Sequence, residues 1–498
     1  MFETKSVSSR FSVSFVFNLF RLGLTLATTI LLARFLGAED YGRLAFLLAS
    51  FLAFKTLIDM SSANAFFTFL SKETRSKSFI RIYWFWMAFQ LFFPLFLLGF
   101  VLPDGVLANI WLNESRSLVI LALIATFMQQ SAWQVASQMA EAQRETMAIQ
   151  GLSNIVVLCH LAAIIFLNFF NLLTLPIILI VLSVEWALAA FLAYRLYSAS
   201  DEKSDTLQSV LSEFWSYCKP LIPFGWLVAA CEFLDRWMLQ LWGGSAEQAY
   251  YAVASNLSTI VILASVSVIK ILWKEFAEAY HQDNMDLLKA LYERWTRIIF
   301  FISSFISGVC IAWSDTIVDI LLGSDYSGGK VAFLLMMIYP VHQCLGQING
   351  VLLFATEKTK LQAIIGSIFT VVSLFTSYYF LAPADAFIPG LHLGSEGLAL
   401  KMLIMNFVAV NALGYVISRK FNWKYKWFFQ FYILAGVIAL GYFSKYLVLG
   451  IFSSVYLSIV LSFIIYSLIV AFLVYCFPSL TLGITRSELN RFTSKISF

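Results

Sequence analysis

Five basic side chains lie inside, or at the inner edge of, stretches that are otherwise apolar enough to span a lipid bilayer. They are Arg21, Lys55, Arg236, Lys270 and Lys401. A charge near the middle of a span disfavours membrane insertion by roughly 2.5–3.5 kcal/mol, so such residues usually face a polar cavity, an acidic partner or a water-filled path. The pattern therefore predicts a path through the membrane that attracts anions.

Two of the five cations have acidic neighbours at helical spacing. Lys55 is followed one turn later by Asp59, and Arg236 has Glu232 one turn before it and Asp235 beside it. Partial neutralisation within the same helix is therefore the alternative interpretation for both cations.

The other three cations have no acid one turn away. For Arg21 and Lys401 we favour a role in a cavity or in ligand binding, with an ion pair to another helix as the alternative. Lys270 is the weakest candidate, because a lysine at the inner edge of a span can extend its ammonium group to the membrane surface.

Buried carboxylates are candidates for coupling transport to an ion. Glu185 stands near the centre of an apolar run, where it could carry a proton, bind a cation, or pair with a basic residue of another helix. Together with the acids beside Lys55 and Arg236, the ion-coupling candidates are Asp59, Glu185, Glu232 and Asp235.

Glutamine side chains recur at four-residue spacing in two apolar runs. One run carries Gln130, Gln134 and Gln138, and another carries Gln343 and Gln347. Such rows can hydrogen-bond sugar hydroxyls, although hydrogen bonds between helices are the commoner use of intramembrane amides.

The sequence does not favour an enzyme. The four histidines have no metal-ligand spacing, and the stretch 323–331 lacks both the spacing and the hydroxyl residue of a phosphate-binding loop. We therefore expect no catalytic residue, no metal site and no cofactor, apart from H⁺ or Na⁺ as a coupling ion. We also expect no nucleic-acid partner.

The composition is that of a polytopic membrane protein. Of the 498 residues, 60% are hydrophobic and only 12% are charged, and the mean hydropathy is +0.81. Runs of about 20 apolar residues match a hydrocarbon core of roughly 30 Å. We predict an all-α protein with fourteen transmembrane helices: 15–35, 44–66, 82–102, 117–138, 148–169, 172–195, 222–242, 250–273, 298–317, 331–354, 361–381, 398–417, 427–447 and 455–477.

Charge and cysteine patterns complete the predicted topology. With both termini in the cytoplasm, most of the 33 lysines and arginines fall in the inner segments, as the positive-inside rule requires. The six cysteines lie in or beside apolar runs, so a disulfide framework is not expected.

Short internal matches indicate a repeat of six helices. Residues 148–151 and 363–366 share an Ala-Ile-x-Gly pattern at an offset of 215, and a looser match relates Gly37 to Gly243 at an offset of 206. Because six is even, the two halves would enter the membrane in the same sense. We predict a six-helix bundle over 1–198, a cytoplasmic linker over 199–216, a second, pseudo-symmetric bundle over 217–420, and helices 13 and 14 with a tail over 421–498.

Three motifs resemble those of the polysaccharide flippases in the multidrug/oligosaccharidyl-lipid/polysaccharide exporter superfamily. Residues 32–42 read LARFLGAEDYG, residues 234–239 read LDRWML, and residues 321–326 read LLGSDY. The family often has Gly before the Tyr that follows the seventh helix, whereas this chain has Ala249 before Tyr250.

The resemblance implies two six-helix bundles that rock around a cationic cavity in the bacterial plasma membrane. The implied cargo is an oligosaccharide on undecaprenyl diphosphate, which moves to the outer leaflet for O-antigen, lipopolysaccharide or other surface polysaccharide biosynthesis. Its diphosphate would bind Arg21, Lys55, Arg236, Lys270 and Lys401. A polysaccharide polymerase and chain-length machinery are the implied partners. The alternatives are a lipid II flippase, a cation or drug antiporter, and a membrane polysaccharide polymerase or glycosyltransferase.

Overall fold

The computed structural model describes residues 7–72, 75–143, 145–195 and 205–488, although a few side chains within these ranges are not described. Contacts divide the chain into two compact units. The first unit comprises Met1–Ala252 and Leu374–Gly394, and the second comprises Val253–Ser373 and Ser395–Phe498. The predicted division into bundles at 198 and 217 stays a prediction.

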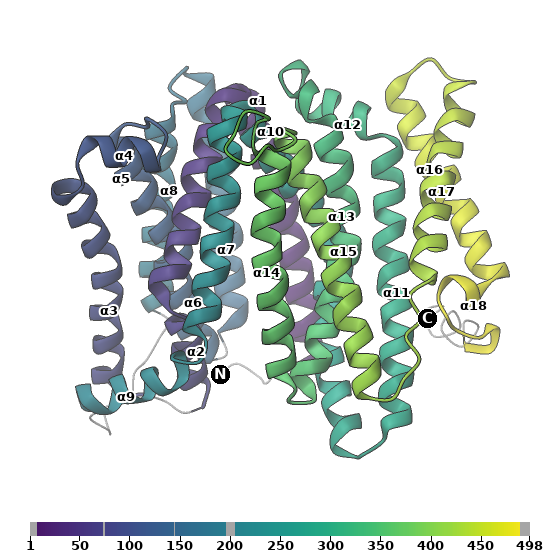
Figure 1. The fold of residues 1–498 in the computed structure, drawn as a ribbon, viewed down its shortest axis with the longest axis horizontal. Coiled ribbons are helices and arrows are strands. Elements are labelled where there is room, and N and C mark those ends of the chain that lie inside the picture. The colour runs from purple at the N-terminus through teal and green to yellow at the C-terminus, as the bar shows by residue number, and fades with distance from the viewer. Residues whose placement is uncertain (1–6, 73–74, 144, 196–204, 489–498) are drawn as a thin grey trace. The chain divides into compact units, whose positions relative to one another are not determined.

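The described residues are helical throughout, with short turns between helices (Figure 1). In the first part of the chain the elements are α1 (Val7–Asp59), α2 (Ser62–Lys72), α3 (Lys77–Phe96), η1 (Leu97–Val101), α4 (Asp104–Ile110), α5 (Arg116–Phe127), η2 (Met128–Ala132), α6 (Trp133–Ala142), α7 (Thr146–Phe169), α8 (Leu175–Arg195), α9 (Leu207–Cys218) and α10 (Ile222–His281). The remaining elements are α11 (Met285–Ala312), α12 (Ser314–Leu321), η3 (Ser324–Gly329), α13 (Lys330–Ala355), α14 (Thr359–Leu381), α15 (Gly394–Lys420), α16 (Phe429–Leu449), α17 (Val455–Cys476) and α18 (Pro478–Thr481).

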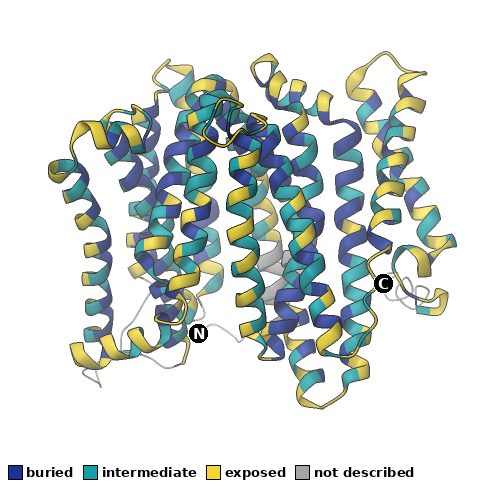
Figure 2. Cartoon of the chain, in the orientation of Figure 1, coloured by how far each residue is buried: buried dark blue, intermediate teal, exposed yellow. Residues whose placement is uncertain are grey.

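Eleven of the described helices are long and apolar enough to cross a membrane. Many large apolar side chains along these helices are solvent-exposed (Figure 2), which suits a lipid environment and would be a liability in water. The protein is therefore a multi-pass, all-helical membrane protein. The number of fourteen helices and the cytoplasmic position of both termini stay predictions.

Two glycines interrupt the longest helices at equivalent places. Gly37 in α1 has φ 74° and ψ 173°, and Gly244 in α10 has φ 82° and ψ −178°. Only glycine adopts this conformation without strain. The two breaks lie 207 positions apart (244 minus 37), close to the offset predicted from the sequence, and they separate pairs of predicted spans. Their shared conformation supports the internal repeat.

Two predicted spans end earlier than expected. The span predicted over 44–66 ends at Asp59, because Met60 and Ser61 take positive φ angles and the chain then starts α2. The span predicted over 298–317 ends at Ala312, after which the short α12 begins. Both corrections concern turns within apolar sequence, which hydropathy alone does not locate.

The segment predicted as a linker contains a helix. Residues 207–218 form α9, which packs against α2 and α3 within the first unit (Figure 1). Val210 and Cys218 on its inner face join the buried aromatic cluster around Phe66, Phe79 and Tyr83. A twelve-residue helix is too short to span a membrane, so hydropathy over membrane-length runs does not reveal it.

The second unit is centred on α11. This helix packs against α13 and α16, and α16 packs in turn against α17. Buried residues from α10, α11, α13 and α15 form the core at one end of the unit, including Phe276, Leu288, Ile348, Leu352 and Ile417. This core supports the polar cavity described below.

Candidate functional site: intramembrane cations and a basic cavity

Arg21 on α1 is hydrogen-bonded to neutral acceptors. Its Nη1 donates to Ser153 Oγ on α7 at 3.2 Å, and its Nη2 donates to Asn18 Oδ1 at 2.8 Å. The close packing of α1 on α7 brings these groups together. Glu141 also interacts electrostatically with Arg21. The guanidinium group is therefore oriented by an interhelical hydrogen bond.

Lys55 and Asp59 have separate partners. Lys55 Nζ donates to Gln134 Oε1 at 2.9 Å. The Asp59 carboxylate instead accepts from Ser62 Oγ at 2.8 Å and from the backbone N–H of Ala63 at 3.2 Å, so it caps the start of α2. Among the ion pairs of the described residues, none joins Lys55 to Asp59. The alternative that Asp59 neutralises Lys55 within the same helix is therefore not observed in this part of the chain.

Arg236 lies over the ring of Tyr251, with its guanidinium carbon 4.4 Å from the ring centroid. Its Nη1 is buried and has no hydrogen-bond partner in the described part of the chain. Its predicted acidic neighbours, Asp235 and Glu232, act on this region through electrostatic interactions, and Asp235 accepts a short hydrogen bond from Ser377. The N–H groups of Arg236 Nη1 therefore have no acceptor among the described residues.

Lys401 on α15 is only 2% exposed. It belongs to the second unit, whereas Arg21, Lys55 and Arg236 belong to the first. The side chain of Lys270 lies outside the described residues. The gathering of all five cations around one ligand therefore stays a prediction.

Glu185 on α8 pairs with a histidine. Its Oε2 lies 2.8 Å from His160 Nδ1 on α7, and the two side chains are 17% and 12% exposed. The sequence led us to expect either an unpaired carboxylate or a salt bridge to another helix. Glu185 instead pairs with His160 of the neighbouring helix, and this contact is a salt bridge only when the imidazole is protonated.

The predicted glutamines fall into two groups. Gln134 accepts from Lys55, Gln347 accepts from Ser265, and Gln130 donates to its neighbour Gln129 at 3.4 Å. The Oε1 atoms of Gln138 and Gln343 are buried without a hydrogen-bond partner among the described residues. Their role as sugar contacts stays a prediction.

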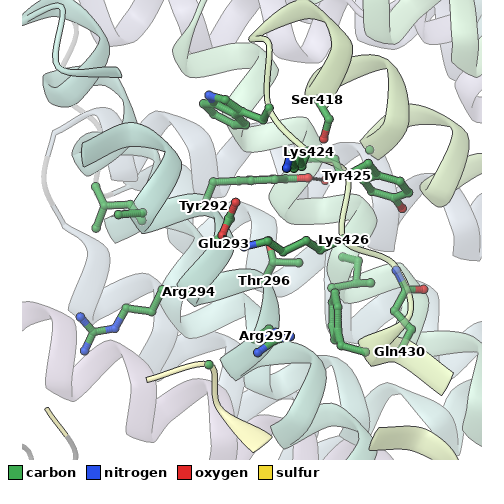
Figure 3. Close-up of a pocket in the computed structure, with 18 of the residues that line it drawn as sticks. Tyr292, Glu293, Arg294, Thr296, Arg297, Ser418, Lys424, Tyr425, Lys426 and Gln430 are labelled. Carbon is green, nitrogen blue, oxygen red and sulfur yellow. Dashed lines mark hydrogen bonds and ion pairs between the residues drawn. The ribbon is translucent and has the colours of Figure 1, made fainter. Parts of the chain in front are cut away.

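The second unit contains a polar cavity of about 500 Å³, walled by α11, α13, α15, the 421–428 loop and the segment 483–488 (Figure 3). Four of its lining side chains are basic: Arg294, Arg297, Lys424 and Lys426. They lie at the end of the helices that the sequence predicts to be cytoplasmic. We call this the basic cavity.

Two of these cations are paired with acids. Lys426 Nζ lies 2.6 Å from Glu293 Oε2, and Arg294 Nη1 lies 3.7 Å from Glu488 Oε1. Arg297 donates to the backbone oxygen of Ser479 at 2.9 Å.

Tyrosines add hydrogen-bonding groups to the wall. Burial raises the pKa of Tyr425 to about 12, so its hydroxyl stays protonated at neutral pH; this hydroxyl donates to Asn411. Tyr292 donates to Asn349 Oδ1 at 2.8 Å. In Figure 3, Lys424 lies beside both rings.

The sequence did not predict the basic cavity as a site. Its basic residues come from segments more than 120 positions apart, and each group was explained by the positive-inside rule. A second signal was present: Tyr292 and Tyr425 lie next to the basic residues in both segments.

Comparison with solved structures shows the fold. The lipid II flippase MurJ in an inward closed conformation matches with a TM-score of 0.70 at 14% identity, covering 93% of this chain and 98% of that chain. An outward-facing multidrug resistance MATE transporter of the MOP superfamily gives a TM-score of 0.53 at 12% identity, covering 83% and 94%. The Vibrio cholerae MATE transporter VcmN, as a mutant, gives 0.51 at 14% identity, covering 83% and 97%. At these identities the likeness concerns the fold.

Sequence comparison shows the family. None of the curated proteins compared matches the chain. The profile described as "polysaccharide biosynthesis protein" matches residues 31–330, more than half of the sequence and a range that contains all three motifs in full. The resemblance predicted from those motifs is confirmed, and the chain belongs to the polysaccharide biosynthesis protein family, with the fold of MurJ and the MATE transporters of the MOP superfamily.

Proposed function

We propose that the protein is a flippase that moves an oligosaccharide linked to undecaprenyl diphosphate from the cytoplasmic to the outer leaflet of the bacterial plasma membrane. Membership of a polysaccharide biosynthesis family and a fold shared with a lipid II flippase both support a lipid-linked sugar as cargo. Translocation would proceed by alternating access, with the polyprenyl chain remaining in lipid.

The observation that carries this proposal is the unpartnered Nη1 of Arg236. A buried N–H of a charged group is expensive to leave without an acceptor, and native structures rarely do so without a functional reason. A diphosphate supplies several anionic oxygens, which form strong charge-assisted hydrogen bonds with guanidinium groups. Bound cargo would supply acceptors for the N–H groups of Arg236 Nη1.

The other predicted residues take roles that follow from this one. Arg21, Lys55, Lys270 and Lys401 would join Arg236 around the diphosphate. The glutamines whose oxygens lack partners would contact sugar hydroxyls.

Glu185 is the ion-coupling candidate for which the contacts suggest a mechanism. Its contact with His160 provides two groups that can share a proton in the membrane. Asp59 is engaged as a helix cap and Asp235 by Ser377. Glu232, which interacts electrostatically with Asp235, completes the set of candidates.

A translocation assay in proteoliposomes tests the proposal. Labelled undecaprenyl-diphosphate oligosaccharide is incorporated, and its appearance in the opposite leaflet is followed by accessibility to a reagent that cannot cross the membrane. We expect Arg21→Ala and Lys401→Ala to lose most of the transport, while Arg195→Ala, which removes an exposed arginine that lies over Phe191, keeps it. Wild-type flux in both Arg21→Ala and Lys401→Ala would overturn the cation assignment.

A lipid II flippase is the second candidate, because the MurJ match covers 93% of the chain. The same proteoliposomes supplied with lipid II distinguish the two cargos by their relative rates. A drug antiporter would instead favour a cavity lined by acids, which fits the buried cations poorly. A polymerase would lengthen the sugar chain in vitro, and that result would replace the flippase proposal.

A further inference from the structure

An apolar groove lies about one helical turn along α11 from the basic cavity. The groove has a volume of about 380 Å³ and lies between α11 and α17, with Phe301 and Phe305 on one wall and Val470 and Tyr475 on the other. Arg297 of the basic cavity precedes Phe301 by four residues, or about one helical turn of 5.4 Å. One side of α11 thus carries guanidinium groups first and then apolar rings.

A second guanidinium group lies at the groove. The guanidinium carbon of Arg486 lies 5.1 Å from the ring centroid of Tyr475, and Tyr475 lines the groove. Arg486 therefore lies against a groove-lining ring, whereas Arg297 lies over Phe429 of the basic cavity, one helical turn before Phe301. A cationic end followed by an apolar channel is the complement of an anionic amphiphile.

The basic cavity has more positive than negative charge. Its four cations face two carboxylates, one of which pairs with Lys426 at 2.6 Å and the other with Arg294 at 3.7 Å. Lys424 is exposed and contacts no carboxylate among the described residues. The hydroxyl of Thr296 is buried and has no hydrogen-bond partner in the same part of the chain. The cavity therefore offers a free ammonium group and a free hydroxyl to a ligand.

We infer that the basic cavity and the apolar groove together bind an anionic glycerophospholipid of the surrounding membrane. The phosphate lies against Arg297 and Lys424, with Arg294 at the rim, and one acyl chain occupies the groove between α11 and α17. Guanidinium and ammonium groups in a polar cavity match a phosphodiester, whereas a zwitterionic headgroup would bring its own cation into this positive field.

The rim favours a lipid over a free phosphate ion. Trp427 and Phe428 follow Lys426 in the loop and are 47% and 70% exposed, and aromatic residues of this kind are enriched at membrane interfaces. Phe477 and Leu480, beside the segment that closes the cavity, are also exposed. A free phosphate would leave both the rim and the groove unused. The site does not depend on the proposed cargo, because none of its residues is among those proposed to bind that cargo.

Native mass spectrometry of the full chain in detergent tests the inference. Phosphatidylglycerol and phosphatidylcholine with identical acyl chains are titrated separately, and inorganic phosphate is added as a competitor. Each basic residue near an anionic lipid contributes about 1 kcal/mol, or about fivefold in affinity. We expect Lys424→Gln to weaken phosphatidylglycerol binding about fivefold, and Glu488→Gln to strengthen it by removing a negative charge 3.7 Å from Arg294. Lys274→Gln, an exposed lysine paired with Glu278 at 3.6 Å, is the matched control and should bind like the wild type.

A second variant separates the lipid from a free anion. Ala471→Phe fills the groove from an exposed position on α17, so it should weaken phosphatidylglycerol binding while leaving the basic cavity intact. Equal binding of both lipids, or wild-type binding by Lys424→Gln, would overturn the inference. So would competition by inorganic phosphate together with normal lipid binding by Ala471→Phe, because the site would then take a free anion.

Discussion

The substitution Arg236→Lys isolates the guanidinium group on which the proposed function depends. It keeps the positive charge near Asp235 and Glu232, so the electrostatic interactions with these acids are largely retained. It removes the planar group that lies 4.4 Å from the Tyr251 ring centroid and the Nη1 that has no described acceptor. Loss of the ring contact should lower stability, because that contact exists without cargo. Loss of Nη1 should lower cargo binding, because the proposed cargo would supply its acceptor.

The magnitudes separate the two effects. A cation–π contact contributes about 0.5–2 kcal/mol, and lysine retains part of it, so the free energy of unfolding should fall by less than about 1 kcal/mol. A charge-assisted hydrogen bond to cargo contributes about 1.5–3 kcal/mol, so the affinity for the diphosphate should fall about 10- to 150-fold. Lysine cannot reproduce the two-pronged geometry of arginine toward an anion.

Two measurements on the same preparation check this prediction. Thermal unfolding in detergent reports stability, and translocation in proteoliposomes at limiting cargo reports binding. Tyr251→Phe keeps the ring and serves as the control for the stacking contact. If Arg236→Lys transports at the wild-type rate, or if its transport falls only in proportion to the folded protein recovered, the unpartnered N–H has no role in cargo binding.

Three further predictions concern packing and chemistry away from the cargo. A Cβ at Gly42 would lie 1.7 Å from the backbone oxygen of Ser245. Gly42→Ala should therefore lower the free energy of unfolding by about 1–3 kcal/mol. Gly23 has open space around it, so Gly23→Ala should not lower it. Burial, with a contribution from a nearby carboxylate, raises the pKa of Cys218 to about 11. Only about 10⁻³ of the thiol is therefore ionised at pH 8. Alkylation of Cys218 in the native protein should be slow at pH 8, and its rate should rise about tenfold per pH unit below that pKa. Lys445→Met should reduce thermal stability but leave transport unchanged, because Lys445 only joins α16 to the end of α11.

The sequence predicted the helices well because apolar length is a local property. It failed at turns inside apolar sequence, such as the one after Asp59, and at α9, which is too short to span. The partners of the intramembrane cations are a different problem. Arg21 meets Ser153 across 132 positions and Lys55 meets Gln134 across 79. No spacing rule reaches that far, since these contacts depend on which helices pack together. The nearby acid that helical spacing suggested for Lys55 is occupied as a helix cap.

The basic cavity was missed for a related reason. A basic residue at the inner end of a helix already has an explanation in membrane topology, so the same pattern fits both a topology signal and a binding site. Only the packing of α11 and α15 with the 421–428 loop reveals that Arg297 and Lys424 line one space. The positive-inside rule determines where the basic residues occur, and tertiary structure determines which of them can share a ligand.

A cation inside an apolar helix is therefore not evidence of function until its hydrogen bonds are known. Lys445 shows the structural case: its Nζ donates to the backbone oxygen of Ala312 at 2.9 Å and lies 5.1 Å from the Trp313 ring centroid. That ammonium group stabilises helix packing and needs no ligand. Arg236 differs because its ring contact leaves a buried N–H without an acceptor among the described residues. Burying such a group opposes folding, so its presence is best explained by an acceptor that arrives with cargo. Comparing Lys445→Met with Arg236→Lys tests this distinction, because the first should change only stability and the second chiefly transport.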